Sequence, residues 1–278
     1  METVVTNASE WIPVGALGDA FLPENNCLPP ISDLAGRSFT LYFEDGWIIE
    51  HRFIDGDRLS WRLIEGESDS RQGDERYVAT RLREDIYFVD FIKCGERATT
   101  VSLVMDLRRN VFIAVIGELP VAEESLTPFI TRIAQDKELT SVNAVFRRGT
   151  INSPLTGDVV LPEVTRDLLG KRVEYRYSRL ENYEHIYLND RYYTWRCIEG
   201  SEKGLTDTDA CHYYKIEDNL YLFVWREKIV PTLGVIMVDL DAMKTTGKIA
   251  GYEANDFGRV RNFTVGARVR IISVVPAQ

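Results

Sequence analysis

The stretch WRLIEG at residues 61–66 occurs again, with a single substitution, as WRCIEG at residues 195–200. The same offset of 134 residues relates Glu50-His51 to Glu184-His185. Tryptophan and histidine are rare residue types, and both stay in register over half of the chain, which makes coincidence an unsatisfactory explanation. The sequence therefore predicts an internal duplication, in which two copies of one domain follow each other.

The repeat also predicts the domain boundaries. The chain has 278 residues, enough for two domains of ordinary size, and the copies fall at residues 31–120 and 165–278. Residues 1–30 contain four prolines and are predicted to form an irregular N-terminal arm. Residues 121–164 would connect the copies, with a short helix and a strand-like run from Thr140 to Phe146.

Each copy consists of short apolar runs separated by Gly and Asp turns. In the first copy these runs cover residues 39–43, 47–54, 59–64, 76–82, 86–92, 100–106 and 111–116. Such spacing is typical of an antiparallel meander, and closure into a barrel would remove its exposed edges. A barrel of about eight strands can hold one small ligand. The predicted fold class is therefore all-β, with two tandem antiparallel β-barrels.

The composition argues against several classes of partner. The formal net charge is −10, and the longest basic cluster is Arg147-Arg148, whereas a nucleic-acid or anionic-membrane binder would carry a basic patch. The apolar runs have strand length, so no segment is predicted to span a membrane. The start of the chain lacks the pattern of a signal peptide, and the four cysteines form no CxxC pair. We therefore expect reduced thiols and a cytoplasmic protein.

Aromatic residues gather on one strand face after another in the second copy. Alternate residues of a strand point to the same side, so Tyr175 shares a face with Tyr177, and His185 with Tyr187. Flat apolar walls with hydrogen-bonding tips suit an aromatic or conjugated ligand, although an ordinary aromatic core would have the same composition. The predicted substrate-binding residues of this copy are Tyr175, Tyr177, His185, Tyr187, Arg196, Tyr214 and Trp225.

Arg196 is the most specific of these candidates. If its side chain faces the lumen, its charge needs a partner. Asp218 or Glu199 could supply a structural partner, which is the more frequent case, or a ligand carboxylate could bind it in bidentate fashion. Arg62 occupies the matching position in the first copy and is a further substrate-binding candidate.

His212 is a candidate acid or base because the first copy has no histidine at the matching position. The matched pair His51 and His185 favours an inherited structural role instead. No histidines have the spacing of zinc ligands, and neither GxGxxG, a P-loop nor GxSxG occurs. We therefore expect no metal and no cofactor, and chemistry carried by side-chain acids and bases alone.

These residues carry a resemblance to a known family. The run YEHIYLND at residues 183–190, YTWR at 193–196 and WREK at 225–228 resemble the C-terminal domain of the MoaF family, and residues 36–66, with EDGW at 44–47, resemble its N-terminal domain. The resemblance covers nearly the whole chain. The family's name implies a part in molybdenum cofactor biosynthesis.

Each half is also similar, more weakly, to the phenolic acid decarboxylases, which are lipocalin-like (calycin-type) barrels. In that family two tyrosines and an arginine hold the substrate, and a glutamate acts as acid and base. The second copy keeps both tyrosines but has Asp218 in place of the glutamate, whereas the first copy keeps Glu84 but has Leu41 and Phe43 in place of the tyrosines. The resemblance implies Asp218 and Glu84 as catalytic candidates beside His212.

Two main hypotheses for the function follow. The first is a cofactor-independent lyase, isomerase or cyclase that acts on a small aromatic or conjugated hydrophobic molecule. The second is a non-catalytic lipocalin-like carrier or accessory protein; in a further alternative, one barrel is only structural. We expect the larger and more polar cavity in the second copy, because of its two extra tyrosines. A second copy of the chain is a candidate partner in a homodimer.

Overall fold

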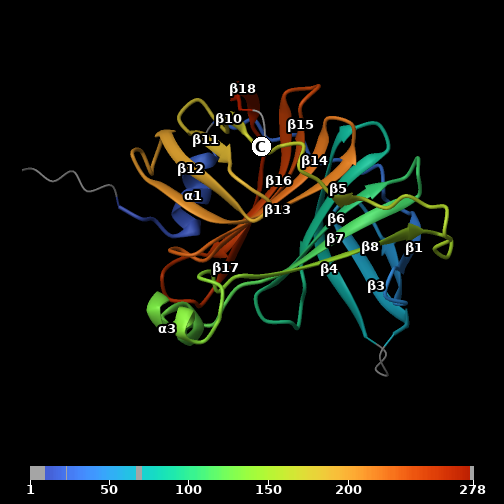
Figure 1. Ribbon diagram of the computed structural model, residues 1–278. Helices are drawn as coiled ribbons and strands as arrows, with labels where there is room; N and C mark the ends of the chain where they lie inside the picture. The colour runs from blue at the N-terminus through green and yellow to red at the C-terminus, as the bar shows by residue number, and fades with distance from the viewer. Residues whose placement is uncertain (1–9, 23, 67–70, 276–278) are drawn as a thin grey trace, which may run out of the picture.

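The computed structural model describes residues 10–22, 24–66 and 71–275, and it shows two antiparallel β-barrels packed against each other (Figure 1). Barrel 1 closes when its eighth strand pairs with its first, as in the cross-strand pair Leu41 and Ile151. The predicted all-β fold with two tandem barrels is confirmed. The strands of barrel 1 are β1 (Ser38–Phe43), β2 (Ile48–Phe53), β3 (Arg58–Glu65), β4 (Gln72–Arg83), β5 (Ile86–Ile92), β6 (Thr99–Asp106), β7 (Val111–Glu118) and β8 (Asn143–Ile151).

Barrel 2 repeats this meander, and pairing between β12 and β13 completes its closure. Its last wall is divided: β17 pairs with β16 along six residues, whereas β18 runs beside β10 and touches β16 only at Lys244 and Arg268. The strands are β10 (Lys171–Arg176), β11 (Asn182–Tyr187), β12 (Tyr192–Glu199), β13 (Thr206–Glu217), β14 (Leu220–Glu227), β15 (Thr232–Asp239), β16 (Lys244–Tyr252), β17 (Val260–Val265) and β18 (Arg268–Val274), with the short β9 (Glu163–Val164) beside β13.

The duplication is visible in the backbone as well as in the sequence. Gly36 and Gly170 both have positive φ, at 76° and 77°, which a glycine adopts without strain. Each donates its N–H to the carbonyl oxygen at the end of the second strand, Phe53 in barrel 1 and Tyr187 in barrel 2, at 2.8 and 2.9 Å. The repeated glycine therefore marks the same turn into each barrel.

A third apolar core joins the barrels. The outer faces of β5, β6 and β7 pack against those of β13, β14 and β15, which explains why several of these strands are buried along their whole length. Polar contacts also cross this contact region: Thr80 and Thr246 share a hydrogen bond of 2.6 Å, and Lys248 donates to Thr100 at 2.8 Å. The two barrels therefore form one packed body.

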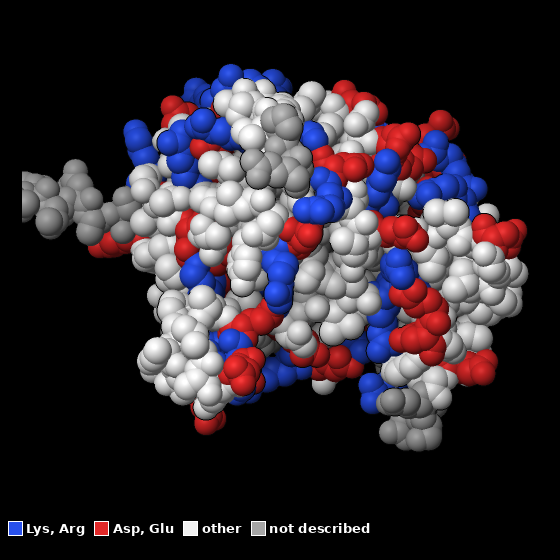
Figure 2. All heavy atoms as spheres, in the orientation of Figure 1, with Lys and Arg blue, Asp and Glu red and all other residues white. Residues whose placement is uncertain are grey.

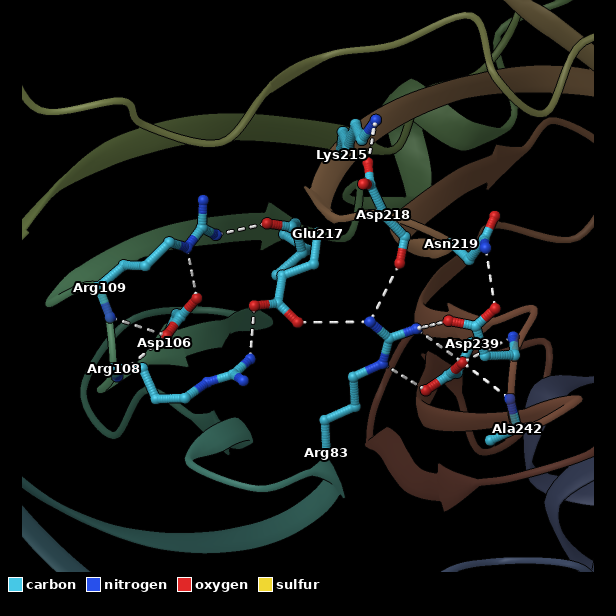
Figure 3. A network of polar contacts seen from close by, with 12 residues as sticks. Arg83, Asp106, Arg108, Arg109, Lys215, Glu217, Asp218, Asn219, Asp239 and Ala242 are labelled. Carbon is cyan, nitrogen blue, oxygen red and sulfur yellow. Dashed lines mark hydrogen bonds and ion pairs between the residues drawn. The ribbon is translucent and has the colours of Figure 1, made fainter.

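A charged network at the edge of this core also links the barrels (Figure 3). Arg83 of β4 donates to both carboxylate oxygens of Asp239, at 2.8 and 3.0 Å, and reaches Glu217 at 3.3 Å. It also donates to the backbone carbonyl of Asp218 at 3.0 Å. One arginine of barrel 1 thus contacts two turns of barrel 2.

The N-terminal arm is not irregular throughout, which corrects the prediction from its prolines. Helix α1 (Val14–Phe21) packs on β16 and β17 and covers one end of barrel 2. Pro13 precedes the helix at its N-cap, where a proline does not interrupt helical hydrogen bonds. The ring of Phe21 lies 4.8 Å from that of Tyr177, so the arm completes the apolar core of barrel 2.

The connecting segment also contributes to barrel 1. It begins with two short helices, α2 (Ala122–Ser125) and α3 (Phe129–Ala134), and continues into β8. The strand-like run expected from Thr140 to Phe146 corresponds to the first part of β8, so barrel 1 needs residues beyond 120 to close. None of the helices in the described ranges has the length and apolar character needed to cross a bilayer.

Candidate functional site

The lumen of barrel 1 holds a cavity of about 290 Å³ that opens at one end of the barrel. Its walls are mainly aromatic and aliphatic, as expected for a site that binds small organic molecules. The wall includes Phe43, Trp47, Ile49, Trp61, Phe91 and Leu103.

Cationic side chains stand at the aromatic walls of this cavity. The Nζ of Lys93 lies 4.6 Å from the ring centroid of Trp61, and the Cζ of Arg147 lies 4.9 Å from that of Trp47. Lys93 also pairs with Glu96, whereas the guanidinium of Arg71 has no ion-pair partner among the residues that the structure describes. Glu96 and Glu118 line the same cavity, which therefore combines flat apolar walls with charged groups of both signs.

His51 supplies a titratable group to the same cavity. The residue is only 5% exposed, and its Nδ1 has no hydrogen-bond partner in the described part of the chain. Burial lowers the pKa of His51 to about 4, so the imidazole is neutral at pH 7. A neutral imidazole at a cavity wall can accept or donate one hydrogen bond with a ligand.

A polar motif is repeated at the rim of both barrels. In barrel 1 the indole N–H of Trp61 donates to Glu75 at 3.1 Å, and the other oxygen of Glu75 accepts the backbone N–H of Cys94. In barrel 2, Trp195, Asp209 and Lys228 make the same two contacts at 3.0 and 3.1 Å. These residues correspond at the offset of 134, so the motif belongs to the shared scaffold.

The lumen of barrel 2 is nearly full. The rings of Tyr213, Phe223 and Trp225 stack side by side, and the hydroxyl groups of Tyr175 and Tyr187 hydrogen-bond to each other. A cavity of only about 30 Å³ remains beneath α1. Burial raises the pKa of Tyr175, so its hydroxyl stays protonated and acts as a hydrogen-bonding group inside the core.

The expectation of a larger cavity in the second copy is therefore wrong. Tyrosines add polar tips, but they also add ring atoms, and these atoms fill the lumen instead of widening it. The smaller residues Leu41, Phe43, Phe53, Leu59 and Ala79 of barrel 1 stand where barrel 2 has Tyr175, Tyr177, Tyr187, Tyr193 and Tyr213.

Five predicted binding residues do lie inside barrel 2, as strand alternation indicated. Tyr175 and Tyr187 are in its packed core, while Tyr177, His185 and Trp225 line the small remaining cavity. Whether any of them contacts a ligand stays a prediction.

Arg196 and Arg62 do not face a lumen, which corrects the prediction for both. The side chain of Arg196 is 53% exposed and pairs with Glu184 at 2.9 Å, and that of Arg62 is 61% exposed and pairs with Glu50 at the same distance. The neighbouring tryptophans point inward, so strand alternation turns both arginines outward. The structural partner is Glu184, on the adjacent strand, and neither Asp218 nor Glu199.

The predicted acids and bases, and the predicted substrate-binding residue Tyr214, also lie outside the lumens. His212 and Tyr214 occupy the outer face of β13, where both pack against Phe146 of barrel 1, with ring centroids 4.6 and 5.0 Å away. Burial lowers the pKa of His212 to about 4 in this contact region. Asp218 is 92% exposed in the β14 hairpin turn, and Glu84 occupies the matching exposed turn of barrel 1. Neither barrel therefore assembles the constellation of a phenolic acid decarboxylase.

Two further features bear on the choice of site. A shallow groove of about 550 Å³ lies over the network of Figure 3, but its charged groups, including Arg83, Lys215 and Glu217, pair with protein partners. Basic and acidic side chains are interspersed over the face shown in Figure 2. In the described part of the chain, no group of three or more His, Cys, Asp or Glu residues is placed to hold a metal ion.

Sequence reasoning missed the charged groups that distinguish the two lumens. Lys93 and Arg71 of barrel 1, and Glu202 and Glu227 of barrel 2, were not among the candidates. One signal was available: Lys93 and Glu227 correspond at the repeat offset and differ in the sign of their charge.

Two tandem antiparallel barrels, one with an open lumen and one with a filled lumen, define a tandem β-barrel protein. The MoaF N-terminal domain model matches residues 9–121, and the MoaF C-terminal domain model matches residues 162–275. Protein MoaF of Klebsiella aerogenes is 41% identical over 279 residues, which cover 99% of this chain and 100% of that protein. The chain belongs to the MoaF family.

A weaker structural similarity relates the chain to a crystal structure from Burkholderia vietnamiensis that is assigned only provisionally to the beta-lactamases. It has 17% sequence identity and a TM-score of 0.34, and the match covers 40% of this chain and 100% of that one.

Proposed function

We propose that the protein binds a small, flat, conjugated molecule with one anionic group in the lumen of barrel 1. The observation that carries this proposal is the aromatic cavity whose lining includes Arg71, a basic residue for which the described part of the chain shows no ion pair. The relative's name specifies neither a ligand nor a reaction, so the ligand class comes from the cavity.

The size of the cavity supports a ligand of about two rings. An apolar cavity of about 150 Å³ accommodates one benzene molecule. The lumen of barrel 1 has about 290 Å³, roughly twice that space. Trp47 and Trp61 offer faces on which such rings can stack, and a carboxylate on the ligand would complete the charge of Arg71.

Titration calorimetry with 2-naphthoate tests the proposal, with 2-naphthalenemethanol as the uncharged probe. We expect Arg71→Gln to weaken binding of the anion about tenfold, which corresponds to the loss of one charge-assisted hydrogen bond, and to leave the alcohol unaffected. Ala114→Leu, which fills the lumen, should weaken both. Arg196→Gln on the outer face of barrel 2 is the matched control and should change neither. Equal binding in wild type and Ala114→Leu would refute the site.

The second candidate function is a cofactor-independent lyase, isomerase or cyclase that uses the same cavity. His51 favours it, because a neutral imidazole whose Nδ1 has no partner among the described residues can accept a proton from a bound molecule. A native mass spectrum of freshly purified protein would identify a retained ligand, and incubation with that ligand would show whether it is converted. Turnover that rises with pH through about 4 and is lost in His51→Gln would support catalysis. Binding without conversion would support a carrier.

A further inference from the structure

The small cavity in barrel 2 has a different chemical character from that of barrel 1. It lies beneath α1, whose side chains Leu17 and Phe21 form its cover. Its walls are the aromatic rings of barrel 2, including both Trp195 and Trp225. Two carboxyl groups, from Glu202 and Glu227, line the same cavity.

These carboxyl groups receive hydrogen bonds from neutral donors. The hydroxyl of Tyr183 donates to Glu202 at 3.0 Å, and the indole N–H of Trp225 donates to Glu227 at 2.8 Å. The nearby ammonium group of Lys228 pairs with other acids, Asp207 and Asp209. Both carboxyl groups therefore line an aromatic cavity that favours their neutral, protonated form. Burial accordingly raises the pKa of Glu202 to about 7, and that of Glu227 well above its ordinary value.

An independent feature points to an occupant that donates hydrogen bonds. His185 lines the same cavity and is only 3% exposed, and its Nδ1 has no partner among the residues that the structure describes. Burial lowers its pKa to about 3, so the ring is neutral and one of its nitrogens carries a lone pair. A buried polar atom without a partner is costly, and a bound N–H donor would satisfy it.

Comparison of the two copies indicates which charge a ligand of barrel 2 would carry. Glu227 corresponds to Lys93 at the offset of 134, and both side chains line the lumen cavities of their own barrels. In barrel 1 the cation lies over the ring of Trp61, whereas in barrel 2 the acid accepts the indole N–H of Trp225. The duplicated position thus carries a basic residue in barrel 1 and an acidic residue in barrel 2, and a cation beside that acid would favour its ionised form.

We propose that barrel 2 binds a small primary ammonium ion, whose N–H groups contact Glu202 and Glu227 and whose charge lies against the surrounding aromatic rings. Aromatic cages recognise ammonium groups through cation–π attraction, and carboxylates add charge-assisted hydrogen bonds. The cavity of about 30 Å³ has about the volume of one water molecule, so without movement of α1 it accepts only the ammonium head. The methyl group of methylammonium, like any longer tail, would have to displace Leu17 or Phe21 of α1. This site does not depend on the one proposed for barrel 1.

Titration of ¹⁵N-labelled protein with methylammonium chloride at constant ionic strength tests the proposal. The indole N–H signals of Trp195 and Trp225 should shift and saturate, whereas those of Trp47 and Trp61 in barrel 1 should stay in place. Single Trp→Phe variants assign the signals. We expect Glu227→Gln to weaken the affinity at least tenfold, and the matched control Glu199→Gln, an exposed acid of the same barrel, to leave it unchanged.

The pH dependence provides a second readout on the wild type. Because the ammonium ion binds the ionised carboxylates, its affinity should rise from pH 6 to pH 8 as Glu202 loses its proton. The charged groups around this pair are Glu181, Asp207, Asp209 and Lys228. Sodium chloride that shifts the same indole signals equally, an affinity that Glu202→Gln and Glu227→Gln both leave unchanged, or an affinity independent of pH would each overturn the proposal.

Discussion

Arg83 provides a stringent test of how the two barrels are held together, and Arg83→Met is the perturbation. The side chain of Asp239 is 2% exposed, and Arg83 contacts both of its carboxylate oxygens. Methionine keeps much of the length and the apolar contacts of arginine but removes the guanidinium. Asp239 would then remain buried with only the backbone N–H groups of Asp241 and Ala242, each at 2.9 Å.

The expected loss of stability is about 2–3 kcal/mol. Removing one partner of a fully buried ion pair costs about 3–5 kcal/mol, because it leaves an uncompensated charge. Arg83 is 21% exposed, so solvent screens part of that loss, and the two remaining backbone donors reduce it further. In a chain of this size each kcal/mol lowers Tm by about 2 °C, which gives a fall of about 5 °C.

Urea unfolding at pH 7, followed by circular dichroism, measures this loss. Arg81→Met is the matched control on the same strand, since Arg81 pairs with the exposed Asp33, and it should cost less than about 1 kcal/mol. A difference between the two variants below about 0.5 kcal/mol would show that the Arg83 network contributes no more than a surface ion pair.

The pH dependence of the Arg83→Met effect checks the mechanism. Burial would raise the pKa of Asp239, but hydrogen bonds from Arg83 and Ala242 hold it below its ordinary value. A lowered pKa contributes stability that is present above the unfolded value, about 3.9, and is lost as the pH falls through the folded value. The difference between wild type and Arg83→Met should therefore be largest near pH 7 and shrink below about pH 4. A difference that grows on acidification would contradict this reasoning.

Two further predictions concern barrel 2. Arg196→Met should lower the free energy of unfolding, measured in urea, by less than about 1 kcal/mol, because the arginine is exposed. A loss above about 3 kcal/mol would show that its ion pair with Glu184 behaves like a buried one and would contradict the prediction. Tyr187→Phe should lower the free energy of unfolding by about 1–3 kcal/mol, because it leaves the buried hydroxyl of Tyr175 without its partner. The double variant Tyr175→Phe/Tyr187→Phe should lose less stability than the sum of the two single variants. Losses that simply add would show that the two hydroxyls do not interact.

The fold could be predicted from the sequence because two independent signals agreed. The offset of 134 residues predicted the duplication, and in the structure it relates the same cross-strand pair in both barrels, His51 opposite Trp61 and His185 opposite Trp195. Strand alternation then placed Tyr175 correctly inside barrel 2. Register is well specified wherever one face of a strand is buried and the other is not.

The same alternation failed on β13, for a physical reason. One face of this strand borders the lumen and the other borders barrel 1, so both are apolar and no pattern distinguishes them. His212 and Tyr214 were therefore assigned to the wrong side. The wrong assignment of Arg196 has a different cause. Its neighbour Trp195 is the more apolar residue and occupies the interior, so strand alternation makes the arginine point outward.

Which barrel holds the larger cavity depends on the volume of the side chains that face the lumen, and the polarity of these residues does not indicate that volume. Each tyrosine that barrel 2 has in place of a smaller residue adds ring atoms to a lumen of fixed circumference, until about 30 Å³ remains. Barrel 1 keeps Leu59 and Ala79 at two of these positions and retains about 290 Å³. In the third core, the outer faces of β5, β6 and β7 pack against β13, β14 and β15 of barrel 2. The inner faces of these barrel 2 strands pack against the filled aromatic lumen. Barrel 1 has fewer apolar contacts inside its open lumen, and the packing of its outer face against barrel 2 offsets part of that loss of stability. This division explains why duplicated barrels can diverge in opposite directions while they keep the same tryptophan–carboxylate motif at the rim.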